Sequence, residues 1–391
     1  MVDNKLKRFE DENENEYINR ICSLKTKNQL TLSWRMLADF LNEQLDMNRS
    51  EKWYRTHYYN GDFEVNIENP SPEETMLMKI GKLKVKAADE RNQARAYIRR
   101  LAREETLKEI AANYASELKD SKPLLTTSNL QFIEDSENSG ILLISDWHYG
   151  MVCDNYWNKF DPEICRSRVS QLQKKTIELI HQENVHELTV LNLSDLIAGR
   201  IHSQIRIESR YNAVQQTMHV AEILAEFLTN LSNHCNVQYY DCLDNHSRVE
   251  PDKNDSLDLE SFVLMIPWYL KARLQGNNHV YINGNEFGPD IITCSVAGHN
   301  IIGVHGHDDS PVTVLDKLSL MTHQHYELMC LAHRHHFQCD EQHQTLIVSN
   351  ASLMGVDSYA EKHRLTSYPS QTFIKSTREN VCESIHRIVL K

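Results

Sequence analysis

The stretch ILLISDWH at residues 141–148 indicates the fold class of this chain. Four consecutive apolar residues bounded by polar ones are typical of a short strand that is buried on both faces. The run ends at Ser145, and Asp146, Trp147 and His148 follow it, so a carboxylate and an imidazole come directly after the strand. Both groups bind metal ions and transfer protons, which makes this strand end a candidate functional site.

Four later apolar runs end in the same way. A single Asp-x-His or His-x-His is weak evidence, but five such strand ends in one region are hard to obtain by chance. In layered α/β folds the chemistry collects in loops at the ends of strands, so the sequence predicts one shared site. Its side chains are, in chain order, Asp146 and His148; Asp195; Asn245 and His246; His305 and His307; and His333, His335 and His336.

Strands and helices alternate throughout the region that follows Gly140. Residues 162–183 and 207–232 have helical periodicity, and short apolar runs lie before, between and after them. This alternation predicts a layered α/β domain over residues 139–391. The expected strands are 141–145, 188–193, 237–243, 291–296, 301–304, 328–331 and 345–348.

The order of the motifs, Asp-x-His, Asp, Asn-His, His and His-x-His, resembles the calcineurin-like metallophosphoesterase superfamily over about residues 139–350. The resemblance implies a four-layer αββα sandwich with two metal ions at one edge of the sheets. It extends to exonuclease-like phosphoesterases of phages and prophages, which carry a helix-turn-helix before the catalytic domain. Ser194, Asp244 and Ala332 stand where the family usually has glycine. We therefore expect altered loop geometry there rather than lost metal binding.

The resemblance also implies a metal centre and a mechanism. Two divalent ions about 3.5–4 Å apart clamp a phosphate and lower the pKa of a shared water. Mixed carboxylate, imidazole and amide ligands suit Mn, with Fe and Zn as alternatives. The bridging hydroxide would be the nucleophile, and His246 would protonate the leaving group. The implied ligands are Asp146, His148 and His335 for one ion, Asn245, His305 and His333 for the other, and Asp195 as the bridge.

Several basic side chains near the ligand loops are candidates for contacts with substrate. Arginine suits bidentate contact with phosphate oxygens, and a histidine beside a ligand can touch substrate or orient its neighbour. The alternative for each is a surface or salt-bridged residue. Asp308 and Asp309 are candidates for orienting a ligand imidazole. The substrate candidates are His202, Arg206, Arg248, His307 and His336, with Arg210 close by in the chain.

Residues 1–68 are expected to form a small all-α domain. They contain three short segments of helical periodicity, and Ser33 and Ser50 precede the second and third as expected N-caps. Three such helices resemble a helix-turn-helix, whose third helix enters the major groove of DNA. A helical interaction domain explains the pattern equally well. In the first case the groove-facing side chains would be Lys52, Arg55 and Thr56.

Residues 69–138 are expected to form a long basic helical segment followed by a linker. Between Lys79 and Arg103 nine basic residues oppose two acidic ones, a net charge of +7 in a chain whose total is -13. Such charge usually marks a solvated helix face. In an acidic chain it also fits contact with DNA or, through an approximate heptad seam, with a second copy of the chain.

The composition limits the remaining classes of protein. No apolar run reaches the length of a membrane span and no apolar leader stands at the start, so we expect a cytoplasmic protein without membrane contact. Nine cysteines without a C-x-x-C pair indicate reduced thiols. Of the 20 histidines only His57 precedes residue 139, so the metal-type ligands are concentrated in the α/β domain.

Together these features predict a phosphodiesterase with two metal ions, in the first place a DNA nuclease. One alternative is a phosphatase or phosphodiesterase acting on nucleotides or other small molecules. The other is a DNA-binding regulatory protein with a vestigial metal site. The net negative charge opposes unspecific DNA binding, whereas the local +7 segment favours it.

Overall fold

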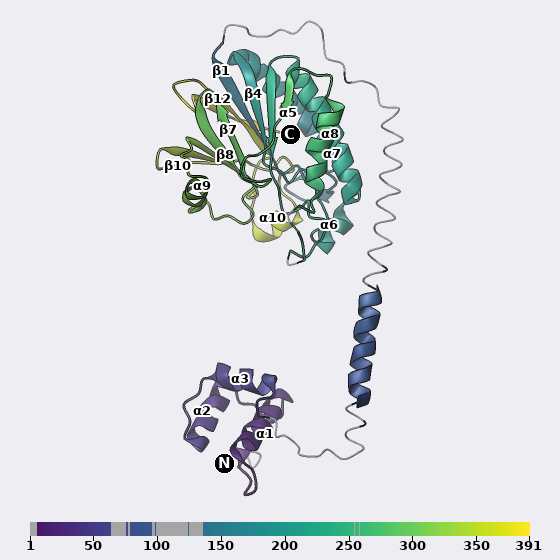
Figure 1. Ribbon diagram of the computed structural model, residues 1–391, viewed down its shortest axis with the longest axis vertical. Coiled ribbons are helices and arrows are strands. Elements are labelled where there is room, and N and C mark those ends of the chain that lie inside the picture. Colours follow the sequence, from purple (N-terminus) through teal and green to yellow (C-terminus); the bar gives the residue numbers. More distant parts are fainter. Residues whose placement is uncertain are drawn as a thin grey trace. The chain divides into compact units, whose positions relative to one another are not determined.

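The computed structural model describes residues 6–63, 76, 79–95, 98, 124 and 136–391, without residues 254 and 258. The chain divides into two compact units, residues 1–101 and 102–391. Their helices and strands are labelled in Figure 1. Within the described ranges, no helix is long and apolar enough to cross a membrane.

Residues 6–63 of the first unit contain three helices where the sequence predicts them. Ser33 and Ser50 cap the second and third helices, as predicted: each side chain accepts a hydrogen bond from the backbone N–H three residues later. Tyr17, Leu37 and Tyr54 are fully buried and join the helices in one hydrophobic core. The helices are α1 (Glu14–Thr26), α2 (Trp34–Leu45) and α3 (Glu51–Asn60).

Helix α3 presents to solvent the side chains expected to contact DNA. Lys52, Arg55 and Thr56 are all exposed, whereas Tyr54 of the same helix is buried. A guanidinium nitrogen of Arg55 lies 3.6 Å from Oε1 of Glu51, one turn earlier in the helix. An exposed ion pair of this kind is weak, so it restrains the arginine side chain only slightly. These side chains are therefore accessible to a partner, and their contact with DNA stays a prediction.

Residues 79–95 form a helix whose side chains are all exposed. Six basic residues oppose Asp89 and Glu90 in this helix, a net charge of +4. Arg99, Arg100 and Arg103 of the predicted +7 segment lie outside the described residues, as does most of the predicted linker. The described part of the segment is thus a solvated basic helix.

The second unit contains a six-stranded sheet with the strand order β13-β12-β1-β4-β5-β6. Strands β1, β4, β5 and β6 run parallel, and β12 and β13 are antiparallel neighbours. Leu143 of β1 lies opposite Leu191 of β4, so Asp146 and Asp195 leave the sheet at the same edge. The strands are β1 (Asn138–Ile144), β4 (Val185–Asn192), β5 (Asn236–Asp241), β6 (Val280–Ile282), β12 (Ser370–Ser376) and β13 (Ser384–Val389).

A five-stranded sheet with the order β10-β11-β9-β8-β7 lies beside it. Strands β8, β9 and β11 are parallel, so His305 after β8 and His333 after β9 also emerge at one edge. Strands β2 (Cys153–Asp154) and β3 (Lys159–Phe160) form a separate small hairpin. The sheet strands are β7 (Ile292–Val296), β8 (His299–Gly303), β9 (Leu328–Leu331), β10 (Gln338–Gln342) and β11 (Thr345–Ser349).

Three hydrophobic cores stack these elements in four layers. Leu142 of β1 packs under helices, whereas its neighbours Ile141 and Leu143 pack toward the second sheet. On the far side of that sheet, Leu315 of α9 packs with Met329 of β9. The order helix, sheet, sheet, helix confirms the predicted αββα sandwich (Figure 1). Its helices are α5 (Pro162–Gln182), α7 (Ala213–Ser232) and α8 (Met265–Arg273) on one face and α9 (Val314–Thr322) on the other.

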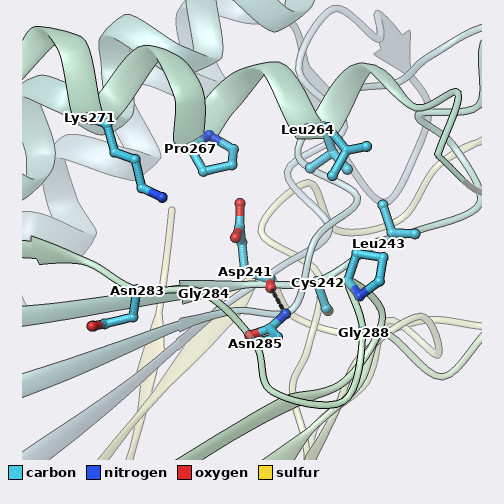
Figure 2. A pocket seen from close by; sticks show the side chains of 12 residues that line it. Asp241, Cys242, Leu243, Leu264, Pro267, Lys271, Asn283, Gly284, Asn285 and Gly288 are labelled. Carbon is cyan, nitrogen blue, oxygen red and sulfur yellow. Dashed lines mark hydrogen bonds between the residues drawn. The ribbon is translucent and has the colours of Figure 1, made fainter.

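Helix α8 also forms one wall of a cavity of about 320 Å³ at the ends of β5 and β6 (Figure 2). A short 3-10 turn, Phe262–Leu264, leads into this helix. Pro267 is the third residue of α8, where the missing N–H costs no hydrogen bond within the helix. The cavity therefore has walls of regular structure on at least two sides.

The predicted helix over 207–232 is wrong at its start. Residues 203–208 belong to a separate short helix, α6 (Ser203–Glu208), and Ser209 is extended. Helix α7 begins only after Asn212, whose side chain forms a capping box with Gln215. Capping groups of this kind stop a helix from extending backward. Helix α10 (Ser358–His363) and strands β6, β10, β12 and β13 were not among the predicted elements.

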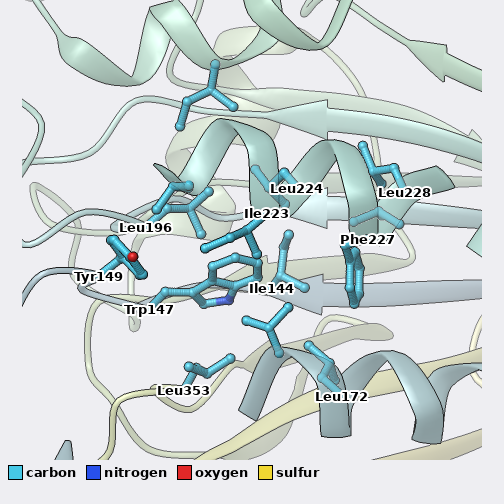
Figure 3. Close-up of a cluster of buried hydrophobic side chains, with 14 of the residues drawn as sticks. Ile144, Trp147, Tyr149, Leu172, Leu196, Ile223, Leu224, Phe227, Leu228 and Leu353 are labelled. Carbon is cyan, nitrogen blue, oxygen red and sulfur yellow. The ribbon is translucent and has the colours of Figure 1, made fainter. Parts of the chain in front are cut away.

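Phe227 of α7 belongs to the helix-side core (Figure 3). It is almost fully buried, so Phe227→Ala leaves a cavity and is expected to destabilise the second unit by about 3–5 kcal/mol. Urea unfolding followed by circular dichroism measures the change. Glu226→Ala, at the exposed neighbouring position, is the control and is expected to change stability by less than about 0.5 kcal/mol. Equal urea concentrations at the midpoint of unfolding for the two variants would contradict the burial of Phe227 in this core.

Candidate metal centre

The loops after β1 and β4 are joined directly by their backbones. The N–H of Asp146 donates to the carbonyl of Ser194 at 2.9 Å, and the N–H of His148 donates to that of Asp195 at 3.1 Å. These bonds continue the parallel pairing of β1 and β4 beyond the sheet. The first two predicted ligand loops are therefore held as one rigid unit.

Asp195 lies at the centre of the predicted ligands. Its Oδ2 atom is 3.1 Å from Nε2 of His305, 3.8 Å from Nε2 of His246 and 3.9 Å from Nε2 of His148. The carboxylate is almost fully buried. A single carboxylate surrounded by imidazoles from three different loops is the arrangement expected of a bridging ligand.

The other predicted ligands gather on the two sides of Asp195. On one side Nε2 of His335 lies 3.4 Å from Oδ1 of Asp146 and 3.1 Å from Nε2 of His148. On the other, Nε2 of His305 lies 3.2 Å from Oδ1 of Asn245. Three groups of side chains are each close enough to hold a metal ion: Asp146, His148 and His335; His148, Asp195 and His246; and Asp195, His305 and His333.

Electrostatics couple Asp195 to His305. Burial would raise the pKa of Asp195, but the imidazoles of His246 and His305 outweigh burial and hold it well below its ordinary value. Burial lowers the pKa of His305, yet the Asp195 carboxylate outweighs burial and raises that pKa to about 10. The two groups thus form a carboxylate–imidazolium pair, and a cation binding here would displace the imidazolium proton.

The pKa values of His148 and His333 are lowered, whereas that of His305 is raised. Burial and the neighbouring His246 hold the pKa of His148 well below its ordinary value. Burial and the charge of His305 lower the pKa of His333 to about 4. Both imidazoles are therefore neutral at physiological pH, which is the form that binds a metal ion.

Three carboxylate oxygens of the site accept no backbone, hydroxyl or amide hydrogen bond among the described residues, and histidine nitrogens lie 3.1–3.4 Å from two of them. They are Oδ1 and Oδ2 of Asp146 and Oδ2 of Asp195, and all three are buried. A buried carboxylate is costly unless it is paired or coordinates a cation. Together with the imidazoles and the amide of Asn245, these oxygens offer the donor set that transition-metal dications accept. The residues therefore fit divalent metal ions.

Backbone carbonyls orient two of the imidazoles. Nδ1 of His305 lies 2.8 Å from the carbonyl of Leu193, and Nδ1 of His246 lies 2.8 Å from that of Ala198. An Nδ1–H that donates to a carbonyl leaves the Nε2 lone pair facing the centre. Asp308, predicted to orient a ligand imidazole, instead lies 3.3 Å from Nε2 of His307.

The ligand loops adopt strained backbone conformations. Asp146, His148, Asp195, His333 and His335 all have positive φ values, between 44° and 66°. Aspartate and histidine tolerate the left-handed region better than most residues, and such outliers cluster at functional sites. The strain is consistent with a site whose geometry is fixed by function.

Two residues that replace the family's usual glycines are hydrogen-bonded to each other. Ser194 has a φ of 72°, the region that glycine favours, and its hydroxyl donates to Oδ2 of Asp244 at 2.5 Å. The same carboxylate accepts from the N–H of Asp195 at 3.0 Å and from the N–H of Ser247 at 2.6 Å. Asp244 is buried and ties the loop of Asp195 to the loop of Asn245. The sequence marked Asp244 only as a departure and missed this role.

Removing the Asp244 carboxylate should loosen both loops. For Asp244→Ala we expect an affinity for Mn²⁺ about 10–100-fold lower, which is the usual effect of losing a partner that orients ligands. Titration calorimetry of the purified chain measures this. Ser247→Ala removes one donor to Asp244, the hydroxyl, and leaves the N–H of residue 247, Ser194 and Asp195 bonded to it, so a smaller loss is expected. Unchanged Mn²⁺ affinity in Asp244→Ala would show that the carboxylate does not hold the loops.

Gly199 allows His246 to approach the loop of Asp195. Its φ is 69°, and a Cβ at this position would lie 1.8 Å from the backbone carbonyl oxygen of His246. Any other residue would push the loop of His246 away from Asp195. The glycine is thus required by a close approach of two backbones.

A buried polar network supports the end of β1. Gln371 of β12 accepts a hydrogen bond from the N–H of Ser145 at 2.8 Å, and the hydroxyl of Ser352 donates to the carbonyl of Asp146 at 2.9 Å. The hydroxyl of Ser367 donates to the carbonyl of His335 at 2.6 Å. No role for the polar segment 355–371 could be inferred from the sequence, because partners such as Ser145 and His335 lie more than 30 residues away in the chain.

The structure places the substrate candidates at different depths. His307 is half-buried, with its ring 5.5 Å from that of His305. His202 and Arg206 are exposed on the short helix α6 and just before it. Arg248 donates to the carbonyl of Pro251 in its own loop. His336 is exposed and bonds the carbonyl of Arg334, and Arg210 pairs with Glu163. His307 is therefore the candidate in direct contact with a predicted ligand.

Known proteins resemble this chain over different lengths. Residues 2–68 match the YonJ N-terminal domain family. The SPbeta prophage-derived uncharacterized protein YonJ of Bacillus subtilis (strain 168) is 23% identical over 372 residues, which cover 91% of each chain. The likeness to this prophage protein thus spans both units.

Solved structures resemble about two thirds of the chain. An archaeal phosphodiesterase is 15% identical, with a TM-score of 0.32, and the match covers 64% of this chain and 99% of that one. Vps29 of Entamoeba histolytica, solved in complex with zinc, is 11% identical, with a TM-score of 0.29 and the same coverage. The fold class itself follows from the strand order and the three cores described above.

Proposed function

We propose that this chain is a metal-dependent phosphodiesterase that cleaves DNA at the centre around Asp195. The observation that carries the proposal is the convergence of side chains from five loops around one buried carboxylate whose Oδ2 faces the imidazole nitrogens of three of them. A fold does not need such an arrangement for its stability, because burying charged groups is costly.

The ligand side chains support two cations rather than one. Asp146, His148 and His335 form one group, and Asp195, His305 and His333 form another, with the amide of Asn245 beside His305. Two divalent cations bound here would polarise a phosphate and lower the pKa of a water between them. We propose Mn²⁺ as the native ion, with Fe and Zn as alternatives.

His246 is proposed as the acid that protonates the leaving oxygen. Its side chain is 17% exposed, whereas the Asp195 carboxylate beside it is buried, so it lies at the open side of the centre. The bond from Nδ1 to the carbonyl of Ala198 fixes the ring and leaves Nε2 to carry the transferred proton. His307, near His305, is proposed to contact a non-bridging phosphate oxygen.

DNA is proposed as the substrate because two helical segments of the chain expose basic groups. Lys52, Arg55 and Thr56 are exposed on α3, and the helix over 79–95 adds a net charge of +4. These contacts would concentrate the catalytic unit on DNA despite the total charge of -13. The match to a prophage protein over both units agrees with a role on DNA.

A substrate panel tests the proposal. The purified chain with Mn²⁺ is expected to cleave DNA oligonucleotides and a chromogenic phosphodiester, to leave a phosphomonoester intact and to stop in the presence of a chelator. Hydrolysis of the monoester alone would indicate a phosphatase instead. No hydrolysis of any substrate by a metal-loaded protein that still binds DNA would indicate a regulatory protein.

The role of the N-terminal unit is tested separately. Replacing Lys52 and Arg55 together by alanine is expected to weaken DNA binding and to make the DNA affinity less dependent on salt concentration. The rate of hydrolysis of the chromogenic phosphodiester is expected to stay unchanged. The matched control replaces Lys25 and Lys27, at the end of α1, by alanine. It removes the same two positive charges, but from a different helix. Equal DNA binding by both double variants would restrict the N-terminal unit to interactions with proteins.

A further inference from the structure

The cavity at the ends of β5 and β6 is lined by none of the predicted metal ligands. Asp241, the last residue of β5, lines it, whereas Asn245 follows four residues later in the chain. In open α/β sheets, small molecules bind beyond the carboxyl ends of parallel strands. A volume of about 320 Å³ is within the range of small-molecule sites.

Two side chains of this cavity, Asp241 and Asn285, offer oxygen atoms as hydrogen-bond acceptors. The carboxylate of Asp241 points into the cavity toward α8 (Figure 2). Burial raises its pKa to about 7, and the nearby Lys271 only partly opposes that effect. The amide nitrogen of Asn285 donates to the carbonyl of Asp241 at 2.7 Å, and its Oδ1 atom is left buried and unpaired. Leaving such a group unpaired costs about 1–3 kcal/mol.

The opposite side of the cavity carries a positive charge. Lys271 of α8 directs its ammonium group toward the cavity (Figure 2), and its charge acts to lower the pKa of Asp241. This ammonium group opposes a metal cation beside the carboxylate, so we assign no metal site to these acceptors. The cavity instead suits an uncharged molecule whose hydrogen-bond donors face Asp241 and whose neighbouring hydrogen-bond acceptor faces Lys271.

Apart from Asn283, the remaining lining residues are apolar or glycine, and part of the wall is held in place by a backbone hydrogen bond. Leu264 and Pro267 line the side formed by α8, and Leu243 lines the strand side. The N–H of Leu243 donates to the carbonyl of Pro289 at 3.0 Å, which fixes the loop after β6 against the end of β5. Apolar walls on both sides favour a flat ring, because both of its faces are then removed from water.

We propose that this cavity binds a guanine base. Guanine carries N1–H and the 2-amino group side by side, which match the two oxygens of the Asp241 carboxylate. Its O6 follows on the adjacent edge, within reach of an ammonium such as that of Lys271. Adenine, cytosine and uracil lack this pair of neighbouring donors. The guanine could belong to a free nucleotide or to the DNA substrate, because the base presents N1–H, the 2-amino group and O6 in both.

Guanosine is the probe, because it has no phosphate and so does not report on the metal centre. By titration calorimetry with the full chain, we expect guanosine to bind at least tenfold more tightly than inosine, which lacks only the 2-amino group. Asp241→Asn is expected to remove this preference and to weaken guanosine binding at least tenfold. Asp316→Asn, the same change on the exposed surface of α9, is expected to leave binding unchanged.

Two outcomes would overturn the proposal: equal binding of guanosine and inosine, or unchanged guanosine affinity in Asp241→Asn. The variant should fold, because it removes a poorly solvated charge, and its melting temperature checks this. Lys271→Met supplies a second test, with weaker guanosine binding expected. Two oligonucleotides that differ only in guanine or hypoxanthine at one position distinguish the two sources. Faster cleavage of the guanine oligonucleotide would mean that the cavity holds a base of the DNA substrate. Equal cleavage would mean that it holds a free nucleotide.

Discussion

Asp195→Asn is expected to lower hydrolysis of a phosphodiester by at least about 1000-fold. The substitution keeps the shape of the side chain and removes the central negative charge, to which imidazoles from three loops are directed. Metal ions supply several kcal/mol of charge stabilisation to phosphoryl transfer, and about 4 kcal/mol corresponds to about 1000-fold in rate. Initial rates with Mn²⁺ and a chromogenic phosphodiester measure the loss.

Asp340→Asn is the matched control, because Asp340 is exposed on the edge strand β10. It is expected to retain the full rate. Asp195→Asn also removes the partner of the buried His305, so circular dichroism and unfolding must establish that the variant is folded. A folded Asp195→Asn variant with more than about a tenth of the wild-type rate would contradict a bridging role.

His246→Gln is expected to slow DNA cleavage by about 100- to 10,000-fold, the range for losing a positioned acid. The effect should depend on the leaving group: an alkoxide leaving group needs the proton, whereas a nitrophenolate does not. We therefore expect a much smaller loss with a chromogenic phosphodiester than with DNA. Initial rates on both substrates give this ratio.

His325→Gln is the control for this substitution, because His325 is exposed in the loop between α9 and β9. The metal content of His246→Gln should equal that of the wild type. An equal loss of rate on both substrates together with a loss of metal would mean that His246 is a ligand and not the acid.

The fold class could be predicted because apolar strands and ligand residues alternate in the sequence itself. Residues 141–144 are a fully apolar run, and they form a strand buried on both faces. Strand β12 was missed because its buried positions include Gln371 and Thr372, whose polar groups are satisfied by partners far away in the chain. Strand β10 was missed because it is an exposed polar edge strand. Neither has the apolar pattern from which strands are inferred.

Strand-end motifs could indicate which side chains converge, but not what holds them. The loops of Asp146 and Asp195 meet because β1 and β4 are parallel neighbours, which an α/β pattern anticipates. The role of Asp244 depends on a serine fifty residues earlier, and local sequence carries no signal for that pair. The cavity at Asp241 depends on the packing of α8 over β5 and β6, which periodicity does not specify.

The most direct measurement of the central claim is the anomalous scattering of crystals of this protein grown with Mn²⁺. We expect two peaks, one beside Asp146, His148 and His335 and the other beside Asn245, His305 and His333, separated by about 3.5–4 Å with the Asp195 carboxylate between them. Peaks elsewhere on the surface, with none beside Asp195, would contradict the account.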